Sequence, residues 1–241
     1  MKVYIQTNEN GTFYNINDYT AYVGFDALGY EIEKYVDADS VKDLDRESIF
    51  VGGIGSIRKR LKNLGLEIPE EFEYPEELSQ FLGRKIWKST LEEVMNENKF
   101  PVFVKPLQTK LFTGKVFSGF KDFIGLKYDN EVPVWCSEII NFETEWRCYI
   151  RYGEILDVRY YKGKWDNKID LKMVADAVSA FKNQPNSFSL DVGIDASGNC
   201  YLVEINDGHS LGTYGIGPIT YAKFLSARWS QLTGTKDYLR F

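Results

Sequence analysis

Residues 189–195 read SLDVGID and residues 202–208 read LVEINDG, and these two stretches decide the fold. Both are short and rich in Val, Ile and Leu, and a turn joins them, so they predict two neighbouring strands. Side chains alternate along a strand, which places Glu204 and Asn206 on one face. Asp191, on the adjoining strand, is expected to project beside them.

Two carboxylates and an amide oxygen are hard ligands of the kind that Mg²⁺ prefers. We therefore predict a magnesium site on Asp191, Glu204 and Asn206. A single glutamate in a strand usually lies on an exposed face. Glu204, however, follows the apolar run YLV, and a buried carboxylate needs a cation or hydrogen bonds because an unpaired buried charge is strongly disfavoured.

The chain around these two strands predicts more strands than helices. Val, Ile, Tyr, Trp and Phe are frequent in five further short stretches, which indicates strands over 102–105, 115–117, 134–139, 145–151 and 155–161. Apolar residues at helical spacing predict helices over 171–181 and from 218 onward. Thr90 and Glu93 have the spacing of a capping box and predict the start of a short helix.

The first seventy-odd residues predict a smaller unit. It has strands at 2–6 and 48–51 and a helix over 56–64. The stretch 69–75 is acidic, bears prolines and lacks periodicity, which is typical of a linker. We place the boundary near Glu73, which gives an N-terminal α/β domain over 1–73 and a second domain over 74–241.

The composition excludes several classes of partner. The formal net charge of -6 argues against nucleic acid or an anionic membrane as a partner. No apolar run approaches the ~20 residues of a membrane helix, and the N-terminus lacks a signal-peptide core, so a cytoplasmic location is expected.

Three cysteines without CxxC spacing are expected to be reduced thiols. One histidine cannot supply a multi-histidine metal shell.

The ordered motifs resemble the ATP-grasp superfamily, whose metal site is an acid on one strand and Glu-x-Asn on the next. The stretch FPVFVKP resembles the strand of that superfamily that ends in a nucleotide-binding lysine, here Lys105. Residues 107–115 resemble its closing loop, with Lys110 as a phosphate contact. Glu138 and Ile139 resemble the hinge positions beside the adenine. Glu145 resembles the acid that binds the ribose.

Within that superfamily, the sequence is most similar to a small phage and bacterial branch named for one arginine and two lysines. The stretches 145–149 (EWRCY) and 204–215 (EINDGHSLGTYG) carry this likeness. The resemblance implies an α+β (α/β) ATP-grasp fold, in which helices flank largely antiparallel sheets. A small N-terminal α/β unit precedes it.

One position departs from the pattern of the superfamily, and it leaves undecided which basic residue supplies a positive charge near the metal-binding aspartate. Many ATP-grasp ligases carry an arginine two residues before the metal-binding aspartate, where this chain has Ser189. Arg147 or Lys162 could supply that charge. Arg147 could instead pair with Glu145 or Glu138; we favour a phosphate contact because a planar guanidinium binds phosphate oxygens in a bidentate manner.

The resemblance implies an enzyme that uses ATP and Mg²⁺. It implies an ADP-forming ligase that joins a carboxylate to an amine through an acyl phosphate, on an amino acid, a peptide or a protein terminus. Arg147, Lys110 and Lys162 are then the catalytic residues. The alternatives are a small-molecule kinase and a nucleotide-binding protein without catalysis. The second alternative is considered because Ser189 stands where many ATP-grasp ligases have an arginine. His209 either faces the substrate or caps a turn.

Overall fold

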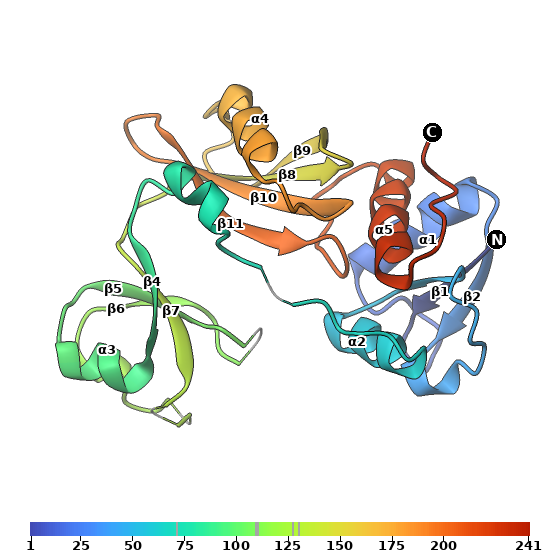
Figure 1. Cartoon of the computed structure of the whole chain (residues 1–241), viewed down its shortest axis with the longest axis horizontal. Helices are drawn as coiled ribbons and strands as arrows, with labels where there is room; N and C mark the ends of the chain where they lie inside the picture. Colours follow the sequence, from blue (N-terminus) through green and yellow to red (C-terminus); the bar gives the residue numbers. More distant parts are fainter. Residues whose placement is uncertain (71, 109–110, 127, 130) are drawn as a thin grey trace. The chain divides into compact units, whose positions relative to one another are not determined.

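The computed structural model describes residues 1–70, 72–108, 111–126, 128–129 and 131–241. These residues form two compact units, of which the first combines Met1–Phe81 with Glu143–Phe241 and the second is Leu82–Phe142 (Figure 1). Helices accompany one parallel and two antiparallel sheets, so the predicted α+β class is confirmed. The domain boundary at Glu73 stays a prediction.

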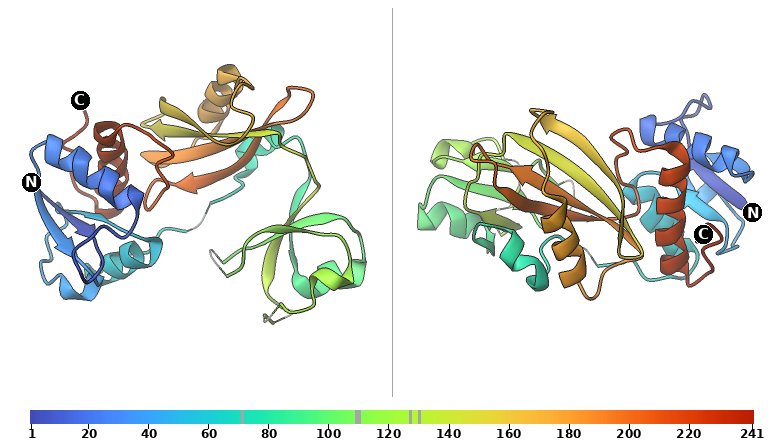
Figure 2. Two further views of the ribbon diagram at one scale, coloured as in Figure 1. Left: turned by 180° about the vertical axis from the view of Figure 1, so that it is seen from behind. Right: turned by 90° about the horizontal axis from the view of Figure 1, so that it is seen from above.

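A small parallel sheet begins the first unit. Its strands are β1 (Lys2–Gln6), β2 (Glu31–Tyr35) and β3 (Ile49–Val51), in the order β2-β1-β3. The helices α1 (Ile16–Ala27) and α5 (Pro218–Thr233) cover one face, and α2 (Ile54–Asn63) covers the other (Figures 1 and 2). The alternating side chains of each strand therefore meet a helical layer on both sides, which explains why β1 and β3 are buried.

The first and last parts of the chain share one hydrophobic core. Phe25 of α1, Phe50 of β3 and Trp229 of α5 are all buried in it. The two helices approach closely at Gly24, where a Cβ would lie 2.0 Å from the carbonyl oxygen of Pro218. This packing fixes the C-terminal helix beside the N-terminal sheet.

A four-stranded antiparallel sheet forms the rest of the first unit. Its strands are β8 (Thr144–Arg151), β9 (Glu154–Gly163), β10 (Ser187–Ile194) and β11 (Cys200–Asp207), in the order β11-β10-β8-β9. The helix α4 (Leu171–Ala180) lies on one face (Figure 1). The ring of Phe181, just after α4, packs 5.4 Å from that of Phe188, so alternate residues from Phe188 onward face α4.

The described residues of the second unit form a smaller antiparallel sheet, the α-helix α3 and a short 3-10 helix over Phe120–Asp122. Its elements are β4 (Ile86–Thr90), α3 (Leu91–Glu97), β5 (Val102–Pro106), β6 (Lys115–Phe117) and β7 (Pro133–Ser137). The strand order is β4-β7-β5-β6. The predicted capping box is confirmed, because Thr90 accepts from the N–H of Glu93 and the Glu93 carboxylate accepts from the N–H of Thr90. Val104, Phe117 and Cys136 belong to its core.

Most element boundaries agree with the sequence. The strand predicted over 134–139 ends at Ser137, and the helix predicted over 56–64 begins at Ile54. The cysteines are free thiols, as expected. Among the described residues, every helix is too short or too polar to cross a membrane.

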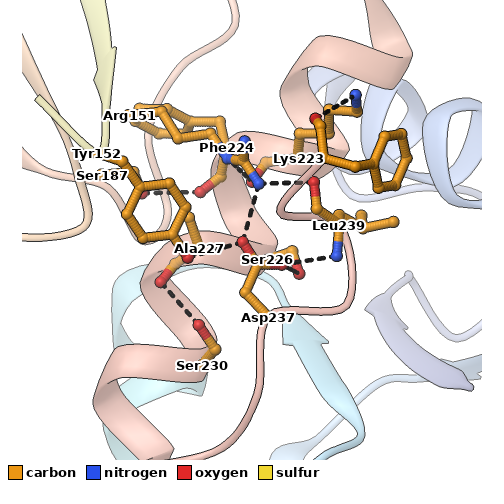
Figure 3. Close-up of polar contacts among 11 residues, drawn as sticks. Arg151, Tyr152, Ser187, Lys223, Phe224, Ser226, Ala227, Ser230, Asp237 and Leu239 are labelled. Atoms are coloured by element: carbon orange, nitrogen blue, oxygen red, sulfur yellow. Dashed lines mark hydrogen bonds and ion pairs between the residues drawn. The ribbon is translucent and has the colours of Figure 1, made fainter. Parts of the chain in front are cut away.

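A buried carboxylate fastens the C-terminal tail to α5 and β8 (Figure 3). Asp237 accepts hydrogen bonds from Arg151 at 2.8 Å, from the Tyr152 hydroxyl at 2.8 Å, from the Ser226 hydroxyl at 2.6 Å and from the N–H of Leu239 at 3.0 Å. The Asp237 side chain is 3% exposed and that of Arg151 is 10% exposed. This ion pair is therefore shielded from water.

Replacing Asp237 with alanine should destabilise the fold by about 3 kcal/mol, because Arg151 would be left buried without its counter-ion. Urea denaturation followed by far-UV circular dichroism measures the loss. Asp166→Ala, at an exposed loop position, is the control and should change stability by less than about 0.5 kcal/mol. Equal stabilities for the two variants would contradict the assignment.

Candidate functional site

The strand register brings the predicted metal ligands to one face of the antiparallel sheet. Asp191 of β10 lies opposite Arg147 of β8 and opposite Glu204 of β11. Asn206 lies opposite Ser189, two residues before Asp191. Because directly opposed residues share a face, all these side chains project from the face away from α4.

The three predicted ligands contact one another. The Nδ2 atom of Asn206 donates to Oε1 of Glu204 at 3.3 Å and to Oδ2 of Asp191 at 3.5 Å. Within the described part of the chain, no group of three Asp, Glu, His or Cys side chains could hold a metal ion. Two carboxylates and an amide side chain meet here, and their oxygen donors are of the kind that suits Mg²⁺, an ion that usually keeps waters and phosphates as further ligands.

Arg147 forms a bidentate ion pair with Asp191. Its Nε donates to Oδ1 at 2.8 Å and its Nη2 donates to Oδ2 at 2.6 Å. The Asp191 side chain is 2% exposed and that of Arg147 is 8% exposed. Burial raises the pKa of the Asp191 carboxyl, and the charge of Arg147 opposes that rise. The sequence suggested Glu145 or Glu138 as the partner of Arg147, and the structure gives Asp191 instead.

Two tyrosines flank this guanidinium. The Arg147 Cζ atom lies 4.8 Å from the ring centroid of Tyr214 and 5.9 Å from that of Tyr161. The two rings stack with centroids 4.7 Å apart. These contacts restrict the orientation of the guanidinium and stabilise its charge.

The predicted ribose-binding acid and one predicted catalytic lysine form an ion pair. Glu145 of β8 lies opposite Lys162 of β9, and the ammonium of Lys162 donates to Oε1 of Glu145. The Tyr161 hydroxyl donates to Oε2 at 2.7 Å. Glu145 is buried, while the Lys162 side chain is 65% exposed. Lys162 does not pair with Asp191, so Arg147 is the cation at that carboxylate.

Three of the predicted nucleotide-binding residues lie in the second unit. Lys105 is in β5, opposite Trp135 of β7, and Glu138 and Ile139 directly follow β7. The Glu138 carboxylate accepts from the N–H of Lys85 at 2.8 Å. Ile139 is 36% exposed. Lys110 lies outside the described residues.

A second acid–base cluster follows the predicted metal ligands, and the sequence did not predict it. Arg228 of α5 binds both oxygens of Asp207, with Nε 2.6 Å from Oδ1. Burial alone would raise the pKa of the Asp207 carboxyl. The contacts with Arg228 and His209 lower it by more than burial raises it, so the pKa of Asp207 lies below its ordinary range. The Nδ1 atom of His209 lies 2.7 Å from Oδ1. No local pattern linked Arg228 to Asp207, because α5 is distant in sequence.

Comparison with known proteins gives a family match. The model of the ATP-grasp domain, R2K clade family 2, matches residues 81–224. A search of curated protein sequences found no match.

Solved structures of ATP-grasp ligases share the fold at low identity. D-alanine–D-alanine ligase from Bacillus anthracis in complex with ATP superposes with a TM-score of 0.57 at 13% identity, covering 97% of this chain and 98% of that chain. L-amino acid ligase from Bacillus licheniformis superposes with a TM-score of 0.58 at 13% identity, covering 96% of this chain and 75% of that chain. The ATP-grasp ligase PsnB in complex with a phosphomimetic variant of its minimal precursor, Mg and ADP superposes with a TM-score of 0.52 at 12% identity. The match covers 96% of this chain and 97% of that chain. These likenesses confirm the predicted fold.

Proposed function

The chain belongs to family 2 of the R2K clade of ATP-grasp domains, and on that premise we propose that it is an ATP- and Mg²⁺-dependent ligase joining a carboxylate to an amine. A carboxylate oxygen takes the γ-phosphoryl group and ADP leaves. The amine nitrogen then bonds to the acyl carbon, phosphate leaves, and the amine loses a proton to water. The carboxylate belongs to an amino acid, a peptide or a protein terminus.

The observation that supports this proposal most directly is the meeting of Asp191, Glu204 and Asn206 on one sheet face. Their oxygens suit Mg²⁺, and we assign them as its ligands. When bound, the metal supplies charge that neutralises the phosphate oxygens during transfer. Glu204 and Asn206 are two residues apart on a strand, so the rigid sheet fixes their spacing.

We assign Arg147 to the phosphoryl group. Its two bonds to Asp191 use Nε and Nη2. Nη1 is then the atom to donate to phosphate oxygens. Because Asp191 and the two tyrosines hold the guanidinium in place, little reorganisation accompanies charge development on the phosphoryl oxygens.

We assign the nucleotide itself to Lys105, Glu138, Ile139 and Glu145. Lys105 would neutralise phosphate charge, and the backbone around Glu138 and Ile139 would lie along the adenine. The Glu145 carboxylate would accept a hydrogen bond from a ribose hydroxyl. That hydroxyl would compete with the Lys162 ammonium for Oε1 of Glu145. Lys162, once displaced, and Lys110 are the further cations proposed for the phosphates.

The solved relatives support this choice of ligands and substrates. One of them was solved in complex with ATP and another with Mg and ADP. Two of the enzymes are named for amino acids that they join. The same fold and the oxygen ligands of this chain make an amino acid the first substrate to test.

Incubating the full chain with Mg²⁺, ATP and mixed proteinogenic L-amino acids tests the proposal. We expect ADP and free phosphate, together with an amide whose mass equals that of the two substrates less water. Chromatography separates the nucleotides and mass spectrometry identifies the product. Formation of AMP, a product that retains the phosphoryl group as a kinase would leave it, or no turnover with any acceptor would each contradict the ligase.

A further inference from the structure

Helix α1 buries a carboxylate in its first turn. Asp18 is 3% exposed and lies on the face of α1 that also buries Ala21, Gly24 and Phe25. Among the described residues, its Oδ2 atom has no hydrogen-bond partner. Burial raises the pKa of Asp18 to about 6, so at neutral pH the carboxyl is mostly ionised. A buried charged oxygen without a partner is costly and calls for an explanation.

Capping of α1 explains only part of this arrangement. The backbone N–H of Asn15 donates to the Asp18 carboxylate, and this bond lowers the pKa of Asp18. The Asn15 side chain itself accepts from the N–H groups of Asn17 and Asp18. One carboxylate oxygen satisfies the capping bond, and an asparagine at position 18 could accept it without burying a charge. The second oxygen, Oδ2, accepts no hydrogen bond from the described residues of the helix.

The groups that face Asp18 do not neutralise it. Tyr35 of β2 and Tyr221 of α5 both sense its charge, which adds to burial in raising the pKa of each phenol. Both tyrosines are therefore neutral at physiological pH. The Tyr35 hydroxyl donates to Val51 at 3.0 Å and the Tyr221 hydroxyl donates to Leu211 at 2.6 Å, so both protons are already used.

The loop over residues 208–217, which we call the 208–217 loop, connects Asp18 to the proposed metal site. Next to Asp18, the Asn17 Oδ1 atom accepts from the N–H of Thr213 at 2.9 Å and from its hydroxyl at 3.1 Å. Tyr214, the next residue, lies under the Arg147 guanidinium. The same loop follows directly on β11, which carries Glu204 and Asn206. Asn17, the neighbour of Asp18, thus holds a loop that also contacts the proposed phosphoryl-binding arginine.

We propose that Asp18 binds the primary ammonium group of an amino acid whose carboxylate is the one activated. This inference rests on the proposed ligase function for the identity of the reacting group. An ammonium carries three N–H donors and a positive charge, which supply what Oδ2 lacks. An ammonium held against a carboxylate stays protonated and cannot attack as a nucleophile. The group at Asp18 therefore belongs to the substrate that is activated, not to the attacking amine.

Binding of amino acids, measured without catalysis, tests the proposal. Isothermal titration calorimetry is run on the wild-type chain, Asp18→Asn and the control Asp26→Asn, an exposed position of the same helix. Each proteinogenic L-amino acid and its N-acetyl counterpart is used, with and without Mg²⁺ and a non-hydrolysable ATP analogue. We expect at least one free amino acid to bind, and Asp18→Asn or N-acetylation to weaken it by roughly 30-fold or more. Asp26→Asn should bind as the wild type does.

Thermal unfolding without any ligand gives a second, independent readout. The folded-state pKa of Asp18 lies above its unfolded value, so the wild-type chain loses stability as the pH rises from about 4 to about 6. Asp18→Asn should therefore have a higher Tm than the wild type at pH 8, and the difference should vanish near pH 4. A lower Tm for Asp18→Asn at pH 8 would mean that the carboxylate is structural and would overturn the proposal.

The failures of the two proposals are distinguishable. Binding of a free amino acid that depends on Asp18, without formation of ADP, would contradict the ligase alone. Amide formation in which Asp18→Asn keeps the wild-type KM, or equal affinity for N-acetyl amino acids, would contradict the role of Asp18 alone. Absence of binding under both nucleotide conditions would also overturn it.

Discussion

Replacing Glu204 with glutamine should lower turnover of ATP by about 10³-fold, because an amide of the same shape removes one of the two negative charges that we propose as ligands of Mg²⁺. The fold should survive. The charge of Glu204 raises the pKa of the buried Asp191 carboxyl, which means that the two carboxylates repel each other. Removing one charge should leave the free energy of unfolding unchanged or slightly higher. Initial rates of ADP release at saturating Mg²⁺ measure the effect.

A magnesium titration separates loss of the metal from damage to the fold. Mg²⁺ that binds only the folded chain should raise the Tm of the wild type, and this rise should be much smaller for Glu204→Gln. Glu154→Gln, an exposed position on β9 of the same sheet, is the control and should behave as the wild type does. Wild-type turnover by Glu204→Gln would show that the metal ligands are wrongly assigned.

The strands and their facing residues could be predicted because the signal is local. Two strands joined by a short turn must lie side by side, and a period of two then decides which side chains share a face. Asp191, Glu204 and Asn206 were placed together on this ground, and their contacts agree with it. The helix α5 could also be predicted from local sequence, since its proline is suited to the first turn and apolar residues follow it at helical spacing.

One α-helix and two strands of the described residues were not predicted from the sequence, for identifiable reasons. The helix α1 contains Gly24 and several β-branched and aromatic residues, so its propensity is weak. The asparagine at its start, Asn15, with an acid three residues on, was the signal that could have revealed it. The strands β2 and β4 are short, and each lies at the edge of its sheet, where charged and polar residues obscure the alternation.

Long-range ion pairs could not be predicted from local patterns. Arg147 and Asp191 are far apart in sequence, and they meet only because β8 and β10 pair in one particular register. The same holds for Asp207 and Arg228, which α5 brings together by packing against the sheet. A sequence states which charges exist, but the strand register decides which of them are neighbours.

Replacing Arg147 with methionine should destabilise the chain by about 3–5 kcal/mol, because the Asp191 carboxylate would stay buried without its counter-ion. For a chain of this length, the Tm should fall by about 10 °C. Differential scanning calorimetry at neutral pH measures the loss. Activity should also disappear, because the proposed phosphate contact is removed along with the ion pair.

A double variant shows whether the ion pair itself is the cause. Arg147→Met combined with Asp191→Leu replaces both charges by apolar groups and should recover stability to within about 1 kcal/mol of the wild type, while activity stays absent. Lys172→Met is the control, because Lys172 and Asp176 form an exposed pair whose loss should cost less than about 0.5 kcal/mol. If the double variant were as unstable as Arg147→Met, packing around the methionine would explain the loss and the ion pair would not. Recovery of the fold without recovery of turnover would mean that this pair is kept for chemistry, since apolar residues fill the same space at no cost in stability.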